Sequence, residues 1–195
     1  MNTQDREKFL VHIMNSGFER AASSFSKLIN RPMKILTNQS VIVRQENKLS
    51  FVSEEKGELY ILITHIIGDV SGKSFLIFNQ EESQEIFNAL NTKVQNQQLN
   101  EAFLLEIDNI ISASVISDLS NALDIEVYGD VPHLIKINSD QLHDLMESEI
   151  EEDHSTMIFS NTTFHFENRE RVHPQFIWKL SSKIFDLIPQ SKMTA

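Results

Sequence analysis

The sequence contains no cysteine, and only five glycines and four prolines among its 195 residues. Without cysteine the chain can form neither a disulfide nor a thiolate metal site, and it has no cysteine nucleophile. So few glycines and prolines leave no stretch that reads as a long flexible linker. Hydrophobic residues make up 41% of the chain, which is enough for a core. We therefore expect a single domain over residues 1–195.

Basic residues and long apolar runs are also scarce. Lysine and arginine total 17 against 28 acidic residues, which gives a net charge of -11. Nucleic acids and anionic membranes attract proteins through basic surfaces, so the charge argues against both partners. The longest apolar runs, residues 60–63 and 75–78, are far shorter than the roughly 20 residues that span a bilayer. The first residues do not resemble a secretory signal, so we expect a cytoplasmic protein.

The spacing of apolar residues predicts alternating helices and strands. Helical periodicity covers residues 3–29, 81–94, 99–123 and 140–146, and Pro174 is a favourable start for a last helix. Strand-like runs lie at residues 33–44, 59–67, 74–78, 125–128, 133–137 and 156–167. The order is helix, strands, helix in each half of the chain.

The two halves also share identical residues. A shift of 94 positions places the first long helix on the third, and six of the 21 residues from 9 to 29 are then identical. The identical pairs are Phe9 and Phe103, Leu10 and Leu104, Ile13 and Ile107, Asn15 and Asn109, Ser23 and Ser117, and Ser26 and Ser120. We predict an α+β fold of two related halves, about 1–95 and 96–190. The halves would share one sheet, with both long helices on one side.

The helix predicted at 99–123 has a polar outer face opposite its broad apolar side. At 100° per residue, Glu106 and Asn109 lie between the small side chains of Ala102 and Ala113. A carboxylate and an amide therefore stand one turn apart where another molecule can approach closely. An ordinary solvated helix face contains the same residue types, so the face alone does not establish a site.

The stretch from Leu105 to Ser114 (LEIDNIISAS) resembles the signature of the CheC/CheX/FliY family of chemotaxis phosphatases. That signature has Asp or Ser, three residues, Glu, two residues, Asn, and a proline about 21 residues later. Glu106 and Asn109 match its centre, and Pro132 follows after 22 residues. Residue 102 departs from it, because alanine stands where the family has Asp or Ser.

The equivalent face in the first half carries Lys8, His12, Asn15 and Glu19. Asn15 keeps the amide, but His12 replaces the acid and no proline stands near residue 37. The resemblance therefore implies a degenerate second site at His12 and Asn15.

The resemblance implies a phosphatase that removes phosphate from the aspartyl-phosphate of a CheY-like response regulator. Asn109 would hold the attacking water and Glu106 would pair with a lysine of the regulator, which would also bring Mg²⁺. The chain itself would need no cofactor and no metal, and its scattered histidines include no His-Glu-x-x-His pattern. A CheD-like deamidase is a possible second partner within this family. Two alternatives stay open, a non-catalytic adaptor that uses the same helix face and a structural or assembly protein.

Overall fold

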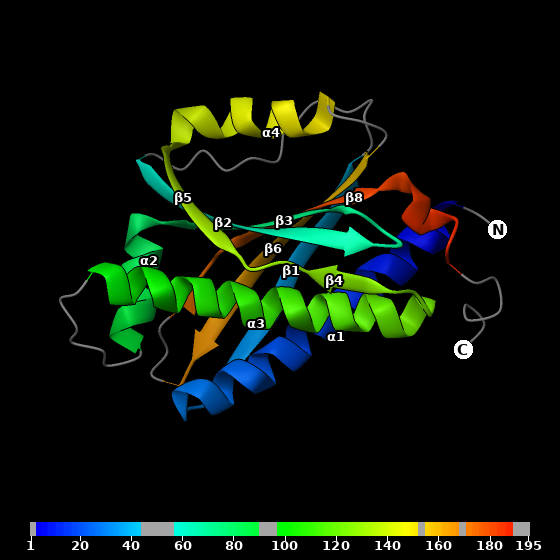
Figure 1. Cartoon of the computed structure of the whole chain (residues 1–195). Coiled ribbons are helices and arrows are strands. Elements are labelled where there is room, and N and C mark those ends of the chain that lie inside the picture. Colours follow the sequence, from blue (N-terminus) through cyan, green and yellow to red (C-terminus); the bar gives the residue numbers. More distant parts are fainter. Residues whose placement is uncertain (1–2, 44–56, 90–96, 152–154, 168–170, 189–195) are drawn as a thin grey trace.

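The computed structural model describes residues 3–43, 57–89, 97–151, 155–167 and 171–188 (Figure 1). Within these ranges the chain has an α+β fold, with four α-helices beside one antiparallel sheet. The first half contains α1 (Thr3–Ile29), β1 (Met33–Val43), β2 (Glu58–Gly68), β3 (Gly72–Asn79) and α2 (Gln80–Ala89). The second contains α3 (Gln97–Leu123), β4 (Val127–Gly129), β5 (His133–Asn138), η1 (Ser139–Gln141), α4 (Leu142–Glu151), β6 (Ser155–Phe166), β7 (Arg171–Val172), β8 (Gln175–Ser181) and η2 (Ser182–Phe185).

The sheet brings the two halves together at its centre. Its strand order is β1-β6-β8-β3-β2, and β4 and β5 both pair with the outer edge of β2. The central strands β3 and β8 come from different halves, and Gly72 pairs with Leu180 there. On either side the strands that open each half pair with the other half, since β1 pairs with β6, and β4 and β5 pair with β2. The arrangement is pseudo-twofold, which confirms the predicted duplicated fold.

The two long helices follow the same offset as the sequence. The bounds of α1 and α3 differ by 94 residues at both ends, and each helix has 27 residues. The residue that follows each helix is in the left-handed region, Asn30 with φ 52° and Asp124 with φ 57°. In both, the N–H group beyond that residue donates back to a serine carbonyl, from Arg31 to Ser26 at 3.1 Å and from Ile125 to Ser120 at 3.2 Å. These are the C-terminal bonds of a Schellman cap.

The helices cover the two faces of the sheet unequally. Apolar residues of α1, α2 and α3 form the larger core with one face, and α4 covers the other face with Leu142 and Met146 (Figure 1). The helices α1 and α3 run antiparallel and approach closely at Gly17, where a Cβ atom would lie 2.6 Å from Cα of Val115. Only glycine permits this approach, so Gly17 marks the helix crossing.

The helix predicted from Pro174 is wrong, because residues 175–181 form the strand β8. The five successive residues from Phe176 to Leu180 are all buried, since β8 is central and covered on both faces. A strand buried on both faces loses the alternating pattern and reads like a helix. The predicted end of the second helix at residues 90–94 lies outside the described residues.

Candidate functional site

The predicted outer face of α3 is exposed. Ala102, Glu106, Asn109 and Ala113 are all open to solvent, whereas Ile107 and Ile111 on the opposite side are buried. Among the described residues, neither Glu106 nor Asn109 has a hydrogen-bond or ion-pair partner. The carboxylate and the amide are therefore available to another molecule, one helical turn apart.

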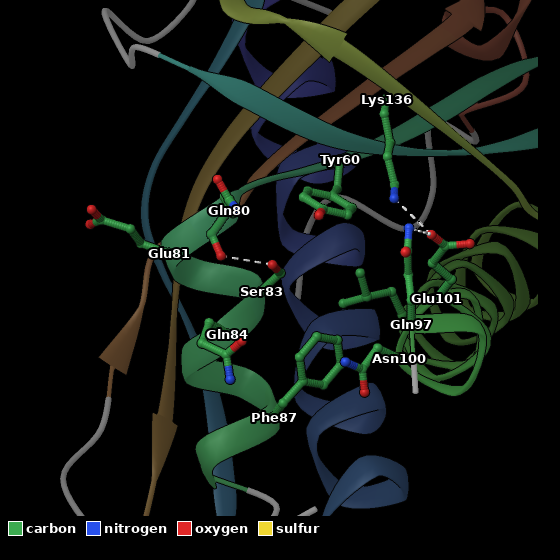
Figure 2. Close-up of a pocket in the computed structure, with 11 residues that line it drawn as sticks. Tyr60, Gln80, Glu81, Ser83, Gln84, Phe87, Gln97, Asn100, Glu101 and Lys136 are labelled. Atoms are coloured by element: carbon green, nitrogen blue, oxygen red, sulfur yellow. Dashed lines mark hydrogen bonds and ion pairs between the residues drawn. The ribbon is translucent and has the colours of Figure 1, made fainter. Parts of the chain in front are cut away.

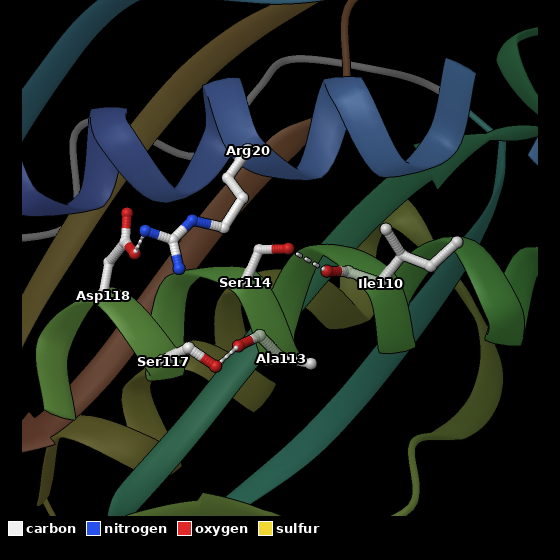
Figure 3. Close-up of polar contacts among 6 residues, drawn as sticks. All are labelled: Arg20, Ile110, Ala113, Ser114, Ser117 and Asp118. Atoms are coloured by element: carbon white, nitrogen blue, oxygen red, sulfur yellow. Dashed lines mark hydrogen bonds and ion pairs between the residues drawn. The ribbon is translucent and has the colours of Figure 1, made fainter. Parts of the chain in front are cut away.

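The serines that follow on α3 add little polarity to this face. Ser117 Oγ donates to the carbonyl of Ala113 at 2.7 Å, and Ser114 Oγ donates to that of Ile110 at 2.7 Å (Figure 3). Because both hydroxyl protons are used by the helix backbone, these side chains present short, mostly satisfied groups. Glu106 and Asn109 are thus the projecting polar groups along this part of the helix.

The acid next to position 102 is held elsewhere. Glu101 Oε1 accepts from Lys136 Nζ at 2.7 Å and from Gln97 Nε2 at 3.0 Å (Figure 2). These hydrogen bonds, the lysine's first, lower the pKa of Glu101. Lys136 also lies 4.9 Å from the ring centre of Tyr60, beside a pocket of about 430 Å³ between α2 and α3. Glu101 therefore faces β5 and does not take the place of the Asp or Ser that the signature has at position 102.

The strand β4 and the segment after it lie beside α3. Gly129 packs on Ile116, where a Cβ atom would meet Cδ1 of that residue at 2.9 Å. Pro132 is buried just before β5. Two large apolar residues of the same segment remain exposed, Tyr128 at 58% and Val131 at 81%. This edge therefore offers apolar surface next to the helix that carries Glu106 and Asn109.

A buried carboxyl lies under α3. Asp108 Oδ2 accepts from Thr64 Oγ1 of β2 at 2.6 Å, and its Oδ1 accepts from Ser112 Oγ at 3.3 Å. Ser112 shares a further hydrogen bond with Ser74 of β3 at 3.2 Å. Burial raises the pKa of Asp108 to about 6, against the lowering effect of its two hydroxyl donors. This network ties α3 to the sheet.

The equivalent face of α1 differs in its amide. Lys8, His12 and Glu19 are exposed, but Asn15 is only half exposed and its Oδ1 atom is buried. Within the described ranges that oxygen has no hydrogen-bond partner. Asn15 thus does not project as Asn109 does, although the sequence places the two at equivalent positions.

Sequence reasoning missed two acids of α3, Asp108 and Asp118, both of which are buried. Each falls on or beside the apolar side of the helical wheel, and an acid at such a position is the signal that would have identified it. Among the described residues no three His, Asp or Glu side chains lie together as a metal site would require. No described helix is long and apolar enough to cross a membrane.

Comparisons with known proteins reveal the fold. No family model matches the chain, and no curated protein matches it. The crystal structure of FliY from Thermotoga maritima is similar over 99% of this chain and 95% of its own, with a TM-score of 0.71 and 15% identity. The chain has the FliY fold. CheX of Desulfovibrio desulfuricans shares that fold, with a TM-score of 0.55 and 16% identity over 87% of this chain and 97% of its own.

Two further structures with this fold contain partner proteins. CheX in its complex with CheY, BeF3 and Mg²⁺ from Borrelia burgdorferi has a TM-score of 0.52 and 15% identity, over 85% of this chain and 96% of its own. The FliG–FliM complex of H. pylori gives a TM-score of 0.63 and 12% identity, over 95% of this chain and 100% of its own. The fold thus occurs in a CheY-bound protein and in FliM.

Proposed function

We propose that this protein is a phosphatase that hydrolyses the aspartyl-phosphate of a CheY-like response regulator. The observation that carries the proposal is the exposed pair Glu106 and Asn109 on α3, which has no partner within the described ranges and has the spacing of the CheC/CheX/FliY signature. The fold similarity to a CheX that is bound to CheY supports the choice of partner.

The reaction needs little from the phosphatase beyond positioning. Water attacks the phosphorus atom, the bond from phosphorus to the regulator's carboxylate oxygen breaks, and inorganic phosphate and the free aspartate result. The regulator supplies Mg²⁺ and a lysine that neutralise the charge on the phosphoryl group. An acyl phosphate has a good leaving group, so a positioned water is enough to accelerate its hydrolysis.

Asn109 is suited to hold that water. Its amide has an acceptor oxygen and donor N–H groups, so it can orient one water molecule in line with the breaking bond. Glu106, one turn away, would accept from the regulator's lysine and fix the docking position through a charge-assisted bond. The small side chains of Ala102 and Ala113 allow the regulator to approach the helix, and Tyr128 and Val131 would extend the contact on one side.

A non-catalytic adaptor is the second candidate, and Ala102 favours it. The acid or hydroxyl that the family has at this position is missing, and Glu101 is bound to Lys136. FliM, which shares the fold, is seen in complex with FliG. An adaptor would use the same face of α3 to bind a regulator or another signalling protein without hydrolysing phosphate.

The test is the decay of a phosphorylated CheY-like receiver domain with the wild-type protein, Asn109→Ala and Glu106→Gln. If the protein is a phosphatase, wild type should speed the decay of the phosphorylated regulator. Asn109→Ala should bind the regulator but accelerate its decay little, and Glu106→Gln should bind it more weakly. Binding without acceleration by wild type would favour the adaptor. Full acceleration by Asn109→Ala would exclude the mechanism.

A further inference from the structure

A second cavity lies between the N-terminal half of α1 and the C-terminal part of α3. It is an open groove of about 530 Å³, and Phe9, Ile13 and Ala122 form its apolar walls. His12 and Asn121 stand at its exposed rim, and Asp118 contributes the carboxylate. The groove is built from neither Glu106 nor Asn109.

The carboxylate of Asp118 is only half satisfied. The side chain is 5% exposed, and Oδ1 forms an ion pair with Nη2 of Arg20 at 2.6 Å (Figure 3). Oδ2 is buried and has no hydrogen-bond partner within the described part of the chain. A buried carboxylate oxygen without a donor costs free energy, and a donor that enters the groove would recover it.

We propose that this groove binds a lysine side chain of a partner protein, whose ammonium group donates to Asp118 Oδ2. The methylene stem would lie along Phe9, Ile13 and Ala122, as lysine stems commonly cover apolar surface. Lysine fits better than arginine, because one acceptor oxygen is left and a guanidinium fork needs two for its paired hydrogen bonds. The net charge of -11 attracts a basic segment rather than an acidic one.

The opposite end of the helix pair differs at the positions equivalent to those of the groove. The offset of 94 residues relates Ala122 to Leu28, Leu119 to Phe25 and Asp118 to Ser24. At that end the ring of Phe25 packs against Phe103, with 6.1 Å between centroids. Leu28 and Phe25 are larger than Ala122 and Leu119, and Ser24 stands where α3 carries the buried acid Asp118. Among the described residues, the buried carboxylate of Asp118 therefore has no counterpart at the equivalent position of α1.

The chemistry of the groove can be tested with n-butylammonium, which reproduces the end of a lysine side chain, in NMR titrations of the full chain. We expect saturable shifts of the amide signals of Ile13, Asn121 and Ala122, and about tenfold weaker binding to Asp118→Asn, which keeps the side-chain shape. Arg20→Gln is the matched control, because it keeps the carboxyl group of Asp118, removes the cation that competes for it, and should bind at least as tightly. Equal binding of n-butanol, or no effect of Asp118→Asn, would overturn the proposal.

The partner class is tested with two short amphipathic peptides, one with a single lysine among leucines and alanines and one with norleucine in its place. We expect the lysine peptide to bind about tenfold more tightly, and Asp118→Asn to remove the difference. Equal binding of the two peptides, or binding of n-butylammonium alone, would overturn the assignment to a protein partner. Asn109→Ala should leave peptide binding unchanged, so this result is separate from the phosphatase test.

Discussion

The helices α1 and α3 share their length, their offset and their caps, yet they differ on both of their faces. On the outer face α3 carries Glu106 where α1 has His12. On the face toward the sheet α3 carries Asp108 and Ser112 where α1 has the buried apolar residues Met14 and Phe18. The positions that end the helices have kept the same conformation, whereas the positions that meet solvent or the sheet have diverged.

This difference separates the requirements of the fold from those of the site. Both helices cover the same sheet face and cross at Gly17, so their shared features maintain the packing of one against the other. The projecting pair of polar groups occurs on α3 only, because Asn15 is half-buried and its neighbour one turn before is a histidine. One copy therefore serves the fold while the other also presents a candidate site.

The largest expected effect concerns the helix crossing. Gly17→Leu should lower the free energy of unfolding by roughly 4 kcal/mol, because the new side chain meets the backbone of Val115 and forces the helices apart. Ile111→Leu, at the equivalent position of α3, keeps its volume and should cost less than about 1.5 kcal/mol. Urea unfolding of both variants measures the difference. Similar losses of unfolding free energy in the two variants would show that the crossing does not depend on the glycine of α1 more than on the equivalent residue of α3.

The next effect compares the two asparagines. Asn109→Ala should slow dephosphorylation of the regulator about a hundredfold, which corresponds to nearly 3 kcal/mol of transition-state stabilisation. Asn15→Ala should change the rate less than about twofold, since its amide does not project. Single-turnover decay of the phosphorylated regulator distinguishes them. Equal losses in the two variants would mean that both helices carry working sites.

A third effect tests the buried acid of α3. The folded pKa of Asp108, about 6, lies above the unfolded value of 3.8, so the folded state holds this proton more strongly. Burial of the ionised carboxylate destabilises the folded state. This destabilisation is absent well below pH 3.8, where the carboxyl is protonated in both states, and it grows as the pH rises until it is complete above pH 6. Wild type should therefore lose about 1.4 kcal/mol of stability between pH 5 and pH 8 from this group.

Asp108→Asn should remove that loss, and urea unfolding at pH 5 and pH 8 measures it. Asp144→Asn, an exposed acid on α4, serves as the control for the change in net charge. If the stability of Asp108→Asn and wild type changed with pH in the same way, burial of the carboxyl would not be the cause.

The smallest effect should be alike in both helices. Asn30→Gly and Asp124→Gly each replace a residue in the left-handed region with the one that adopts it most easily. We expect each variant to gain about 0.5–1 kcal/mol of stability, and Asp124→Gly to gain slightly more because it removes a negative charge from a helix C-terminus. Thermal unfolding measures both. A loss of stability in only one of the two variants would show that the two helix caps are not equivalent.

Much of this architecture could be predicted from the sequence. The spacing of apolar residues located both long helices and the repeat at one offset related them, while helix geometry placed Glu106 and Asn109 on the outer face and the chemotaxis signature singled them out. Whether those two residues act on a phosphate stays a prediction. The strand β8 was missed because residues buried on both faces of a central strand do not alternate. The roles of Asp108 and Asp118 depend on Thr64 and Arg20, which are distant in sequence, so local periodicity could not identify them.

The crossed-over strands β1 and β5 also govern how the chain can fold. Met33 pairs with Phe166 and Glu58 pairs with Asn138, so the outer strands find their partners only in the other half. Long loops must close before these contacts form, and such topologies fold slowly. When only the first half of the chain has left the ribosome, β1 and the outer edge of β2 have no partner strands. Synthesis must reach β6 before the edge strand β1 is covered, and cutting the gene between its two repeats would yield two fragments that each need the other.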